Sequence, residues 1–314
     1  MRRGPPDLSS LPKFRDGMSW LYVEAGRIEA EARGVALVRE DGTYAVPVAE
    51  ISLLMAGPGT SLTHQAAVRL ADHGVTILWT GEAGVRLYAC GLGETRSSKN
   101  LERQASLWAV PASRMRVVRR MYQLRFAETL DPTLSIAEIR GMEGKRVQSA
   151  YREAAVRYGI DWKGRSYERG RWGAADLPNR ALSVAASCLY GLCHAAIVSM
   201  GFSSALGFVH SGRMMSFVYD VADLYKAEIS VPAAFAEVAH GAQDIERRVR
   251  IAMRDRLNET KLLGKIEADL FSVLDLDGSP ADDDPRGTLV DDKGSVPSAE
   301  NYGMRGGQPD DPGP

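Results

Sequence analysis

The sequence predicts an α+β protein in three parts: an N-terminal β-rich domain, a larger all-α C-terminal domain and a disordered tail. Short apolar runs separated by turn signals fill residues 1–92, a pattern typical of strands. Apolar residues then recur at helical spacing through residues 93–275. Residues 276–314 hold seven glycines and six prolines, and their few apolar groups cannot offset the entropy of ordering. Strands followed by helices favour two separate domains over a doubly wound sheet.

Strand and turn signals alternate through the first domain. The expected strands are Met18–Glu24, Gly34–Glu40, Val46–Met55, Val75–Trp79 and Val85–Ala89. Asp41-Gly42, directly after the second run, is a strong signal for a two-residue hairpin turn. Gly57-Pro58-Gly59 ends the strand pattern. A short helix then runs to Asp72, with Ser61 or Thr63 as its cap.

The second domain reads as a series of helices. They are expected at Leu101–Val110, Ala112–Glu128, Ser135–Tyr158, Asn179–Met200, Phe217–Lys226, Ala233–His240 and Ala242–Leu274. Glycine-rich stretches at 164–173 and 201–212 interrupt them. This half of the chain is therefore mostly α.

The net charge of -1 hides an uneven distribution. Residues 275–314 carry ten acidic and three basic side chains, whereas residues 1–274 carry 36 basic and 30 acidic ones. The folded part is mildly basic, which permits a polyanionic partner without requiring one.

Composition narrows the class of protein. Hydrophobic residues make up 45% and charged residues 25% of the chain, which excludes a collagen-like or wholly disordered protein. The three cysteines, Cys90, Cys188 and Cys193, form no CxxC pair, which argues against a disulfide framework or a zinc knuckle and fits a reducing cytoplasm. No secretory signal and no run of about 18 apolar residues is found, so no membrane-spanning segment is expected.

Two carboxylates and a histidine lie close together in the sequence. Asp220 and Asp223 are three residues apart on an expected helix, so they share one face, and Lys226 reaches the same side. His210 lies just upstream in a loop bounded by glycines. These groups either converge on a metal or form a solvated acidic helix face with a loop histidine bonded to backbone.

A third carboxylate is Glu143, which Gly141 and Gly144 flank inside a strong helical pattern. Each interior glycine costs about 0.5–1 kcal/mol relative to alanine, which suggests close helix packing or the close approach of a ligand. Glu143 with His210 and either Asp220 or Asp223 would give one imidazole and two carboxylates, a set suited to Mn²⁺ or Mg²⁺. The alternative for Glu143 is a solvated helix position.

Basic and aromatic residues gather in the middle of the chain. The basic residues are Arg114, Arg116, Arg119, Arg120 and Arg125 on one expected helix, and Arg140, Lys145, Arg146, Arg152 and Arg157 on the next. The following loop adds Trp162, Tyr167 and Trp172. Cations hold phosphates and aromatic faces stack bases, so a nucleic acid is one partner that this region fits. Ordinary solvated helix faces are the alternative for the arginines.

Six motifs in order resemble one family. They are GPGTSLTHQAAVRLA, WTGEAGVRLYACG, RGMEGKRV, SCLYGLCHAAI, GFVHSG and SFVYDVADLYK. Together they resemble the CRISPR-associated adaptation integrases of the Cas1 family, type I-E subtype, from about Leu21 to Leu274. The resemblance implies an N-terminal β domain joined to a C-terminal helical domain, in agreement with the division above.

The resemblance also implies a set of active-site residues. A Mg²⁺ or Mn²⁺ site is implied at Glu143, His210 and Asp223. Asp220 is a second acidic neighbour, and Tyr190 and Lys226 match positions that line the family's active site. These last three, Lys226, Tyr190 and Asp220, are the expected catalytic residues.

Six residues are expected to contact DNA. Arg86 matches a basic position of the family's β domain, and Tyr167 and Trp172 match aromatic positions near the bound DNA end. Arg114, Arg119 and Arg140 come from the basic helices described above.

The implied reaction is transesterification, in which a 3′-hydroxyl of a short DNA duplex attacks a phosphodiester at the leader–repeat boundary of a CRISPR array. Attack on two strands implies a homodimer of this chain, and the family works with the small partner protein Cas2. Two other functions stay open at this point: a metal-dependent nuclease of DNA repair, and a non-catalytic DNA-binding subunit.

Overall fold

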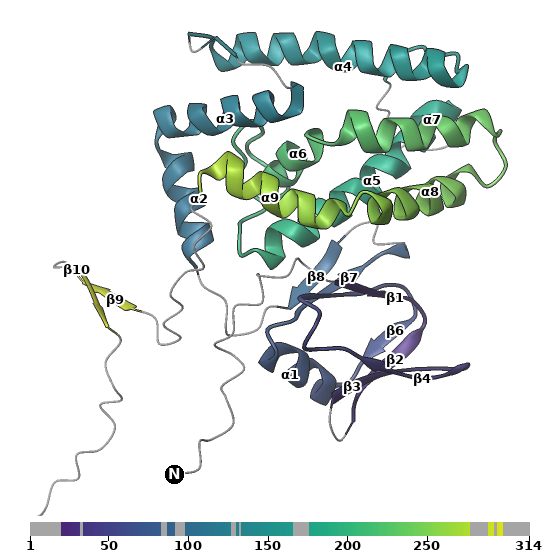
Figure 1. The fold of residues 1–314 in the computed structure, drawn as a ribbon, viewed down its shortest axis with the longest axis vertical. Coiled ribbons are helices and arrows are strands. Elements are labelled where there is room, and N and C mark those ends of the chain that lie inside the picture. The colour runs from purple at the N-terminus through teal and green to yellow at the C-terminus, as the bar shows by residue number, and fades with distance from the viewer. Residues whose placement is uncertain are drawn as a thin grey trace, which may run out of the picture.

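The computed structural model describes residues 20–31, 34–82, 87–91, 98–126, 130–131, 133–165, 176–276, 288–291 and 294–297. Within these residues a strand-rich part is followed by a larger helical part, and Figure 1 shows the helices stacked over one end of the strands. The predicted order of a β-rich region followed by helices is confirmed.

Two four-stranded sheets form the N-terminal part. Their strands are β1 (Trp20–Val23), β2 (Gly26–Glu31), β3 (Gly34–Arg39), β4 (Gly42–Val46), β5 (Leu53–Ala56), β6 (Thr60–Leu62), β7 (Thr76–Thr80) and β8 (Leu87–Gly91). The first sheet has the order β1-β5-β7-β8, parallel except between β7 and β8. The second has the order β4-β3-β2-β6, antiparallel except between β2 and β6.

Local sequence signals account for much of this part. A two-residue turn joins β3 to β4 as an antiparallel hairpin, but it lies one residue before the predicted Asp41-Gly42, because Arg39 pairs with Gly42 and Glu40-Asp41 form the turn. Helix α1 (His64–Asp72) begins after Thr63, whose side chain accepts a hydrogen bond from the backbone N–H of Ala66. The run predicted as one strand at Val46–Met55 is wrong, because β4 ends at Val46 and β5 begins only at Leu53. Pro47 follows Val46 and has no N–H to continue the ladder.

Helix α1 fills the space between the two sheets. Leu70 of α1, Ile28 of the second sheet and Leu54 of the first are all fully buried in one apolar cluster. Burial of each such side chain contributes about 1.5–3 kcal/mol. The two sheets and α1 therefore share a single core.

The helical part contains α2 (Lys99–Ala109), α3 (Pro111–Phe126), α4 (Ile136–Tyr158), α5 (Leu177–Ser199), α6 (Ser216–Asp223), the π-helix η4 (Lys226–Ser230), α7 (Val231–Ala239), α8 (Ile245–Glu259) and α9 (Leu262–Leu274). The single helix predicted at Ala242–Leu274 is wrong, because Lys261 adopts a left-handed conformation (φ 47°) that separates α8 from α9. The sequence pattern also does not predict η4, which begins where the helix expected through Lys226 was to end.

Helix α5 is the centre of the helical core. It buries 14 of its 23 residues, including the free cysteines Cys188 and Cys193. Burial raises the pKa of the Cys188 thiol to about 12, so this side chain is a core residue rather than a nucleophile.

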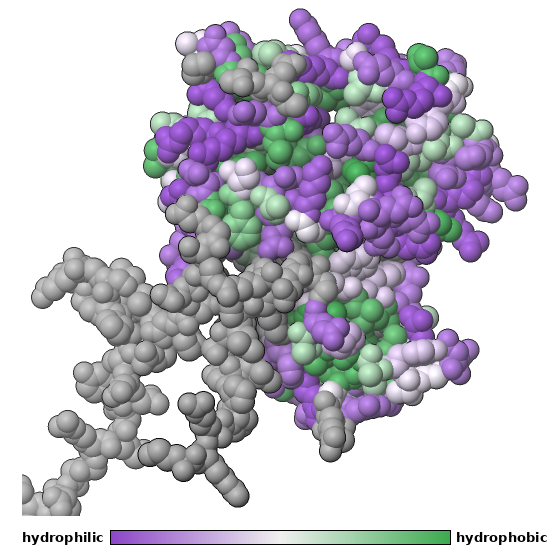
Figure 2. Space-filling view, viewed as in Figure 1, coloured by the Kyte–Doolittle hydropathy of each residue, from purple (hydrophilic) through white to green (hydrophobic). Residues whose placement is uncertain are grey.

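Helix α5 is more apolar than the sequence analysis expects of any segment. By length and composition α5 is long and apolar enough to span a membrane, although 67% of its most apolar window is buried inside the protein. Neighbouring helices cover α5, and the face shown in Figure 2 is mainly hydrophilic over the helical part. Packing within a core accounts for the apolar character of this helix.

Little of the predicted tail, 276–314, is described. Strands β9 (Thr288–Asp291) and β10 (Gly294–Pro297) pair antiparallel there, a pairing that the sequence does not predict. The prediction of a disordered tail otherwise falls on residues outside the described part of the chain.

Candidate active site

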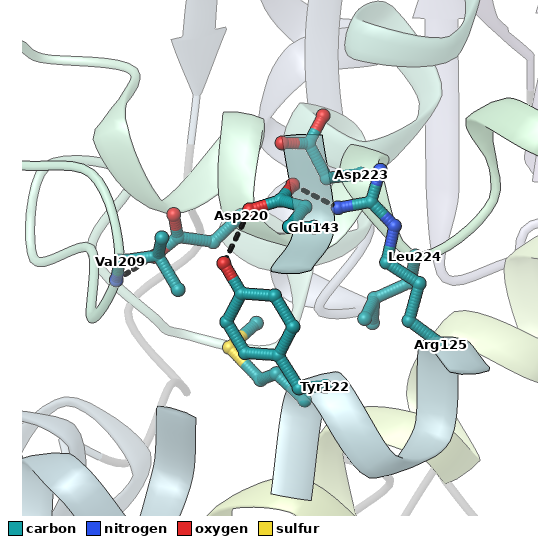
Figure 3. Close-up of a pocket in the computed structure, with 8 residues that line it drawn as sticks. Tyr122, Arg125, Glu143, Val209, Asp220, Asp223 and Leu224 are labelled. Carbon is teal, nitrogen blue, oxygen red and sulfur yellow. Dashed lines mark hydrogen bonds and ion pairs between the residues drawn. The ribbon is translucent and has the colours of Figure 1, made fainter. Parts of the chain in front are cut away.

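A pocket opens where α3, α4, α6 and the loop before α6 meet (Figure 3). It is lined by Met121, Tyr122, Arg125, Glu143, Val209, Asp220, Asp223 and Leu224. The fold thus brings Glu143 of α4 into the same pocket as Asp220 and Asp223 of α6, although about 80 residues separate them in the chain. This convergence joins three of the residues that the sequence predicts for the site.

Asp220 is buried and fully hydrogen-bonded. Its Oδ2 accepts from the backbone N–H groups of Phe208 (2.6 Å) and Val209 (3.0 Å). Its Oδ1 accepts from the backbone N–H of His210 (2.8 Å) and contacts His210 Nδ1 (2.7 Å). A Cβ on Gly207 would lie 2.5 Å from the carbonyl oxygen of His210, so only glycine fits this tight loop. Asp220 therefore holds the loop and positions His210.

His210 is oriented by its contact with Asp220. When Nδ1 donates to that carboxylate, Nε2 is left to accept a proton or bind a metal, as in many metal sites. The hydrogen bond to Asp220 raises the pKa of His210, and burial opposes this rise without cancelling it. The ring also packs edge-on against Tyr219, with centroids 5.9 Å apart.

Glu143 is bonded through both carboxylate oxygens. Its Oε1 forms an ion pair with Arg125 Nη1, and its Oε2 accepts from the hydroxyl of Tyr122. Figure 3 shows both partners reaching Glu143 from α3. Burial, reinforced by the bond to Glu143, raises the pKa of Tyr122, so its hydroxyl keeps the proton that it donates.

Asp223 is paired with Lys226, one turn further along the chain. The ammonium of Lys226 lies 4.9 Å from the centre of the Tyr190 ring. Burial lowers the pKa of Lys226, but the carboxylate of Asp223 and the hydroxyl of Tyr190 outweigh burial and raise the pKa overall. Lys226 is therefore a cation beside Asp223, next to the pocket.

Lys226 is the first residue of the π-helix η4, and the residue before it anchors this segment to the core. Tyr225, immediately before η4, is almost fully buried and donates a hydrogen bond to Asp269 Oδ2 of α9 at 2.7 Å. Single π-turns within helices are frequent at functional sites. This contact ties the segment that carries Asp223 and Lys226 to the core.

The donor set fits a hard divalent cation. Two carboxylates from different helices face the pocket, and an oriented imidazole adjoins it. Among the described residues, no three His, Cys, Asp or Glu side chains converge closely enough to hold an ion as they stand. Each candidate carboxylate ligand is instead neutralised by a cation, Glu143 by Arg125 and Asp223 by Lys226.

Comparison with known proteins finds relatives along nearly the whole chain. The family model described as "CRISPR associated protein Cas1" matches residues 122–246, which include Glu143, His210 and Asp223. The CRISPR-associated endonuclease Cas1 2 of Thermus thermophilus is 48% identical over 314 residues, covering 98% of this chain and 95% of the relative. The chain belongs to the Cas1 family.

Solved structures agree with this membership. A crystal structure of a TtCas1-DNA complex has a TM-score of 0.76 and 51% identity, covering 84% of this Cas1 chain and 99% of the other. A casposase bound to integration product has a TM-score of 0.57 and 15% identity, covering 85% and 94%. At that identity the casposase shows a shared fold alone.

The six residues expected to contact DNA differ in their surroundings in this Cas1 chain. Arg114 Nε donates to the carbonyl of Phe208 at 2.8 Å, and Arg119 donates to that of Leu134 at 2.9 Å, so both arginines brace neighbouring backbone. Arg140 is exposed on α4, one turn before Glu143. The other three, Arg86, Tyr167 and Trp172, lie outside the described residues.

The glycines beside Glu143 do not serve helix packing. A Cβ added at Gly141 or Gly144 would meet nothing within 4 Å. Of the two explanations that the sequence offers, a helix–helix contact within the described chain is therefore wrong for both positions.

Two polar residues of the pocket, Tyr122 and Arg125, are not predicted for the site from the sequence. Tyr122 and Arg125 both bond Glu143, and they are three residues apart on one face of α3. Arg125 was grouped with the other basic residues of its helix, and only its spacing from Tyr122 could have set it apart.

Proposed function

We propose that this Cas1 chain is a CRISPR adaptation integrase, a divalent-metal-dependent DNA endonuclease and integrase that inserts short foreign DNA duplexes into a CRISPR array. The similar T. thermophilus protein is named an endonuclease, and a similar TtCas1 has been solved with DNA. The observation that carries the proposal is the convergence of Glu143 and Asp223 in one pocket beside the oriented imidazole of His210.

The proposed reaction exchanges one phosphodiester for another. A 3′-hydroxyl oxygen of the incoming duplex attacks a phosphorus atom at the leader–repeat boundary. The attacking hydroxyl loses its proton as a P–O bond to the donor forms, the P–O3′ bond of the target strand breaks, and the departing 3′ oxygen takes up a proton, so that no net proton is gained or lost. Water in place of the donor hydroxyl would hydrolyse DNA at the same site.

The pocket residues have separate roles in this proposal. Glu143, His210 and Asp223 would hold Mg²⁺ or Mn²⁺, which when bound supplies Lewis-acid stabilisation of phosphate charge. Asp220 keeps the Nδ1 side of His210 occupied, so Nε2 is the ligand. The ammonium of Lys226, held over Tyr190, faces the negative charge that builds up on the reacting phosphate.

DNA binding would extend beyond the pocket. The proposed contacts are Arg86, Arg114, Arg119, Arg140, Tyr167 and Trp172. The exposure of Arg140, one turn before Glu143 on α4, supports a contact with a strand that enters the pocket. Arg114 and Arg119 each use part of their five-donor guanidinium internally, and the rest can bond phosphate.

The assembly and setting are also proposals. Two strand transfers need two active sites, which supports a homodimer working with Cas2. The motif resemblance supports the type I-E subtype and cytoplasmic action. A β domain at 1–92, a catalytic domain at 93–275 and a tail at 276–314 are the proposed units.

A strand-transfer assay tests this function. Short duplexes ending in a 3′-hydroxyl or a 3′-dideoxy group are incubated with Cas2, a plasmid carrying a CRISPR array, and Mn²⁺, Mg²⁺ or EDTA. Joined product is expected only with the 3′-hydroxyl donor and a divalent ion. Metal-dependent cleavage without joining would instead indicate a repair nuclease. DNA binding with neither reaction would indicate a non-catalytic subunit.

A further inference from the structure

Glu143 already carries a positive partner where the proposed function requires a divalent ion. Arg125 forms its ion pair with one oxygen of this carboxylate, and the two side chains are only 9% and 17% exposed. A shielded pair of this kind is stronger than a surface pair because water screens it less. We propose that Arg125 holds the place of the divalent ion at Glu143 and leaves the carboxylate when the ion binds, an inference that rests on the proposed function.

The chemistry of arginine requires that it move. A guanidinium cannot lose its proton in a protein, so Arg125 cannot yield to a metal by becoming neutral. The other partner of Glu143, the hydroxyl of Tyr122, is neutral and can rotate about its C–O bond. The two partners should therefore oppose metal binding very differently, although both bond the same carboxylate.

Arg125 already has an aromatic contact while it is paired with Glu143. The guanidinium carbon of Arg125 lies 5.2 Å from the centre of the Phe126 ring, within the range of a cation–π contact, and Arg146 lies over the same ring at 4.8 Å. The Phe126 ring itself stacks on Tyr122, with centroids 6.1 Å apart. Arg125 can therefore release Glu143 and remain against an aromatic surface at the edge of the same pocket.

The helix that carries Glu143 also allows such an exchange. In the half of α4 that carries Glu143 only Ile139 is buried, whereas further along the helix Ala155 is buried and Tyr151 packs against Phe235 of α7. Small shifts of α4 can thus bring the carboxylate of Glu143 toward Asp223 once Arg125 has moved.

Calorimetric titration of the full-length chain with Mn²⁺ tests the exchange. Arg125→Gln should bind Mn²⁺ roughly ten-fold more tightly than wild type, because one partly shielded competing charge is lost. Arg125→Lys keeps the charge and should stay close to wild type. Tyr122→Phe removes only a neutral donor and should change the affinity far less than Arg125→Gln. Arg116→Gln removes a charge from an exposed position of the same helix and is the matched control.

Three outcomes would overturn the inference. Unchanged or weaker Mn²⁺ binding by folded Arg125→Gln would make Arg125 a residue that positions Glu143 for the metal. Equal tightening by Arg125→Gln and Tyr122→Phe would show that charge is not what competes. Mn²⁺ binding to none of the proteins would overturn the metal assignment of the proposed function as well, whereas the first two outcomes leave that assignment intact.

Discussion

Helices α4 and α5 are each 23 residues long but differ in their surroundings. Helix α5 buries 14 residues, whereas α4 buries two, and Val156 on α4 is 83% exposed. Figure 1 shows α5 inside the helical layer and α4 along its outer edge. Equal lengths of helix therefore contribute very unequal amounts of packing to this Cas1 protein.

The pocket combines residues from both settings. Its inner half consists of Asp220 and Val209, with His210 adjoining it, and four hydrogen bonds join Asp220 to the loop that carries both residues. Its outer half consists of Glu143, Arg125 and Tyr122, and these join α3 to the weakly buried α4 by polar contacts. The inner half is thus preformed by hydrogen bonds to the backbone. The position of the outer half depends on polar and charged side-chain contacts.

The largest expected difference between the two halves is in stability. In Asp220→Asn the amide group must face backbone N–H donors, and the free energy of unfolding should fall by about 2–4 kcal/mol. In Tyr122→Phe one neutral donor to Glu143 is lost while the ion pair of Glu143 with Arg125 stays, and the loss should be about 1 kcal/mol. Urea denaturation of both variants measures the difference. Equal losses would show that the outer half is as firmly built as the inner half.

Hydrogen exchange compares the two helices directly. Amides in the middle of α5 should exchange only on global unfolding, because they lie within the core. Amides of α4 should exchange through local opening, at a free energy at least about 2 kcal/mol lower. Mass spectrometry of peptides from the two helices provides the measurement. The same protection in both would contradict a weakly held α4.

Much of the helical architecture could be predicted from local signals. Helix α4 begins with a capping box formed by Ser135 and Glu138 and ends at Gly159 in a left-handed conformation, close to the predicted bounds. The break at Lys261 was missed because neither glycine nor proline marks it. The π-helix η4 was missed because a single wide turn leaves no trace in a 3.6-residue pattern.

The types of residue that form the site can be predicted from the sequence, whereas most of the contacts between them cannot. The i,i+3 spacing of Asp220 and Asp223 cannot show which of the two is bonded to the loop and which is paired with Lys226, since that depends on loop N–H groups that bond only Asp220. The partnership of Arg125 with Glu143 joins two helices, and no local pattern reports it.

The smallest expected effect is a pH dependence of the inner half. Because the pKa of His210 is raised in the fold, its stabilising contribution is fully present below the ordinary histidine value of about 6.5. This contribution is lost as pH rises through the raised value. In EDTA, the stability of wild type relative to His210→Gln should therefore decline between pH 6 and pH 9. A relative stability that increases over this range would mean that Asp220 does not favour the protonated ring.

The most direct test of the proposed metal site compares isosteric variants of its three ligands. Glu143→Gln, His210→Gln and Asp223→Asn should each lower Mn²⁺-dependent strand transfer roughly a thousand-fold or more, because ligands of one site act as a unit. Glu153→Gln, on the exposed face of the same α4 helix, should retain wild-type activity. Near-normal transfer by any two of the three ligand variants, with all four proteins folded, would contradict the assignment.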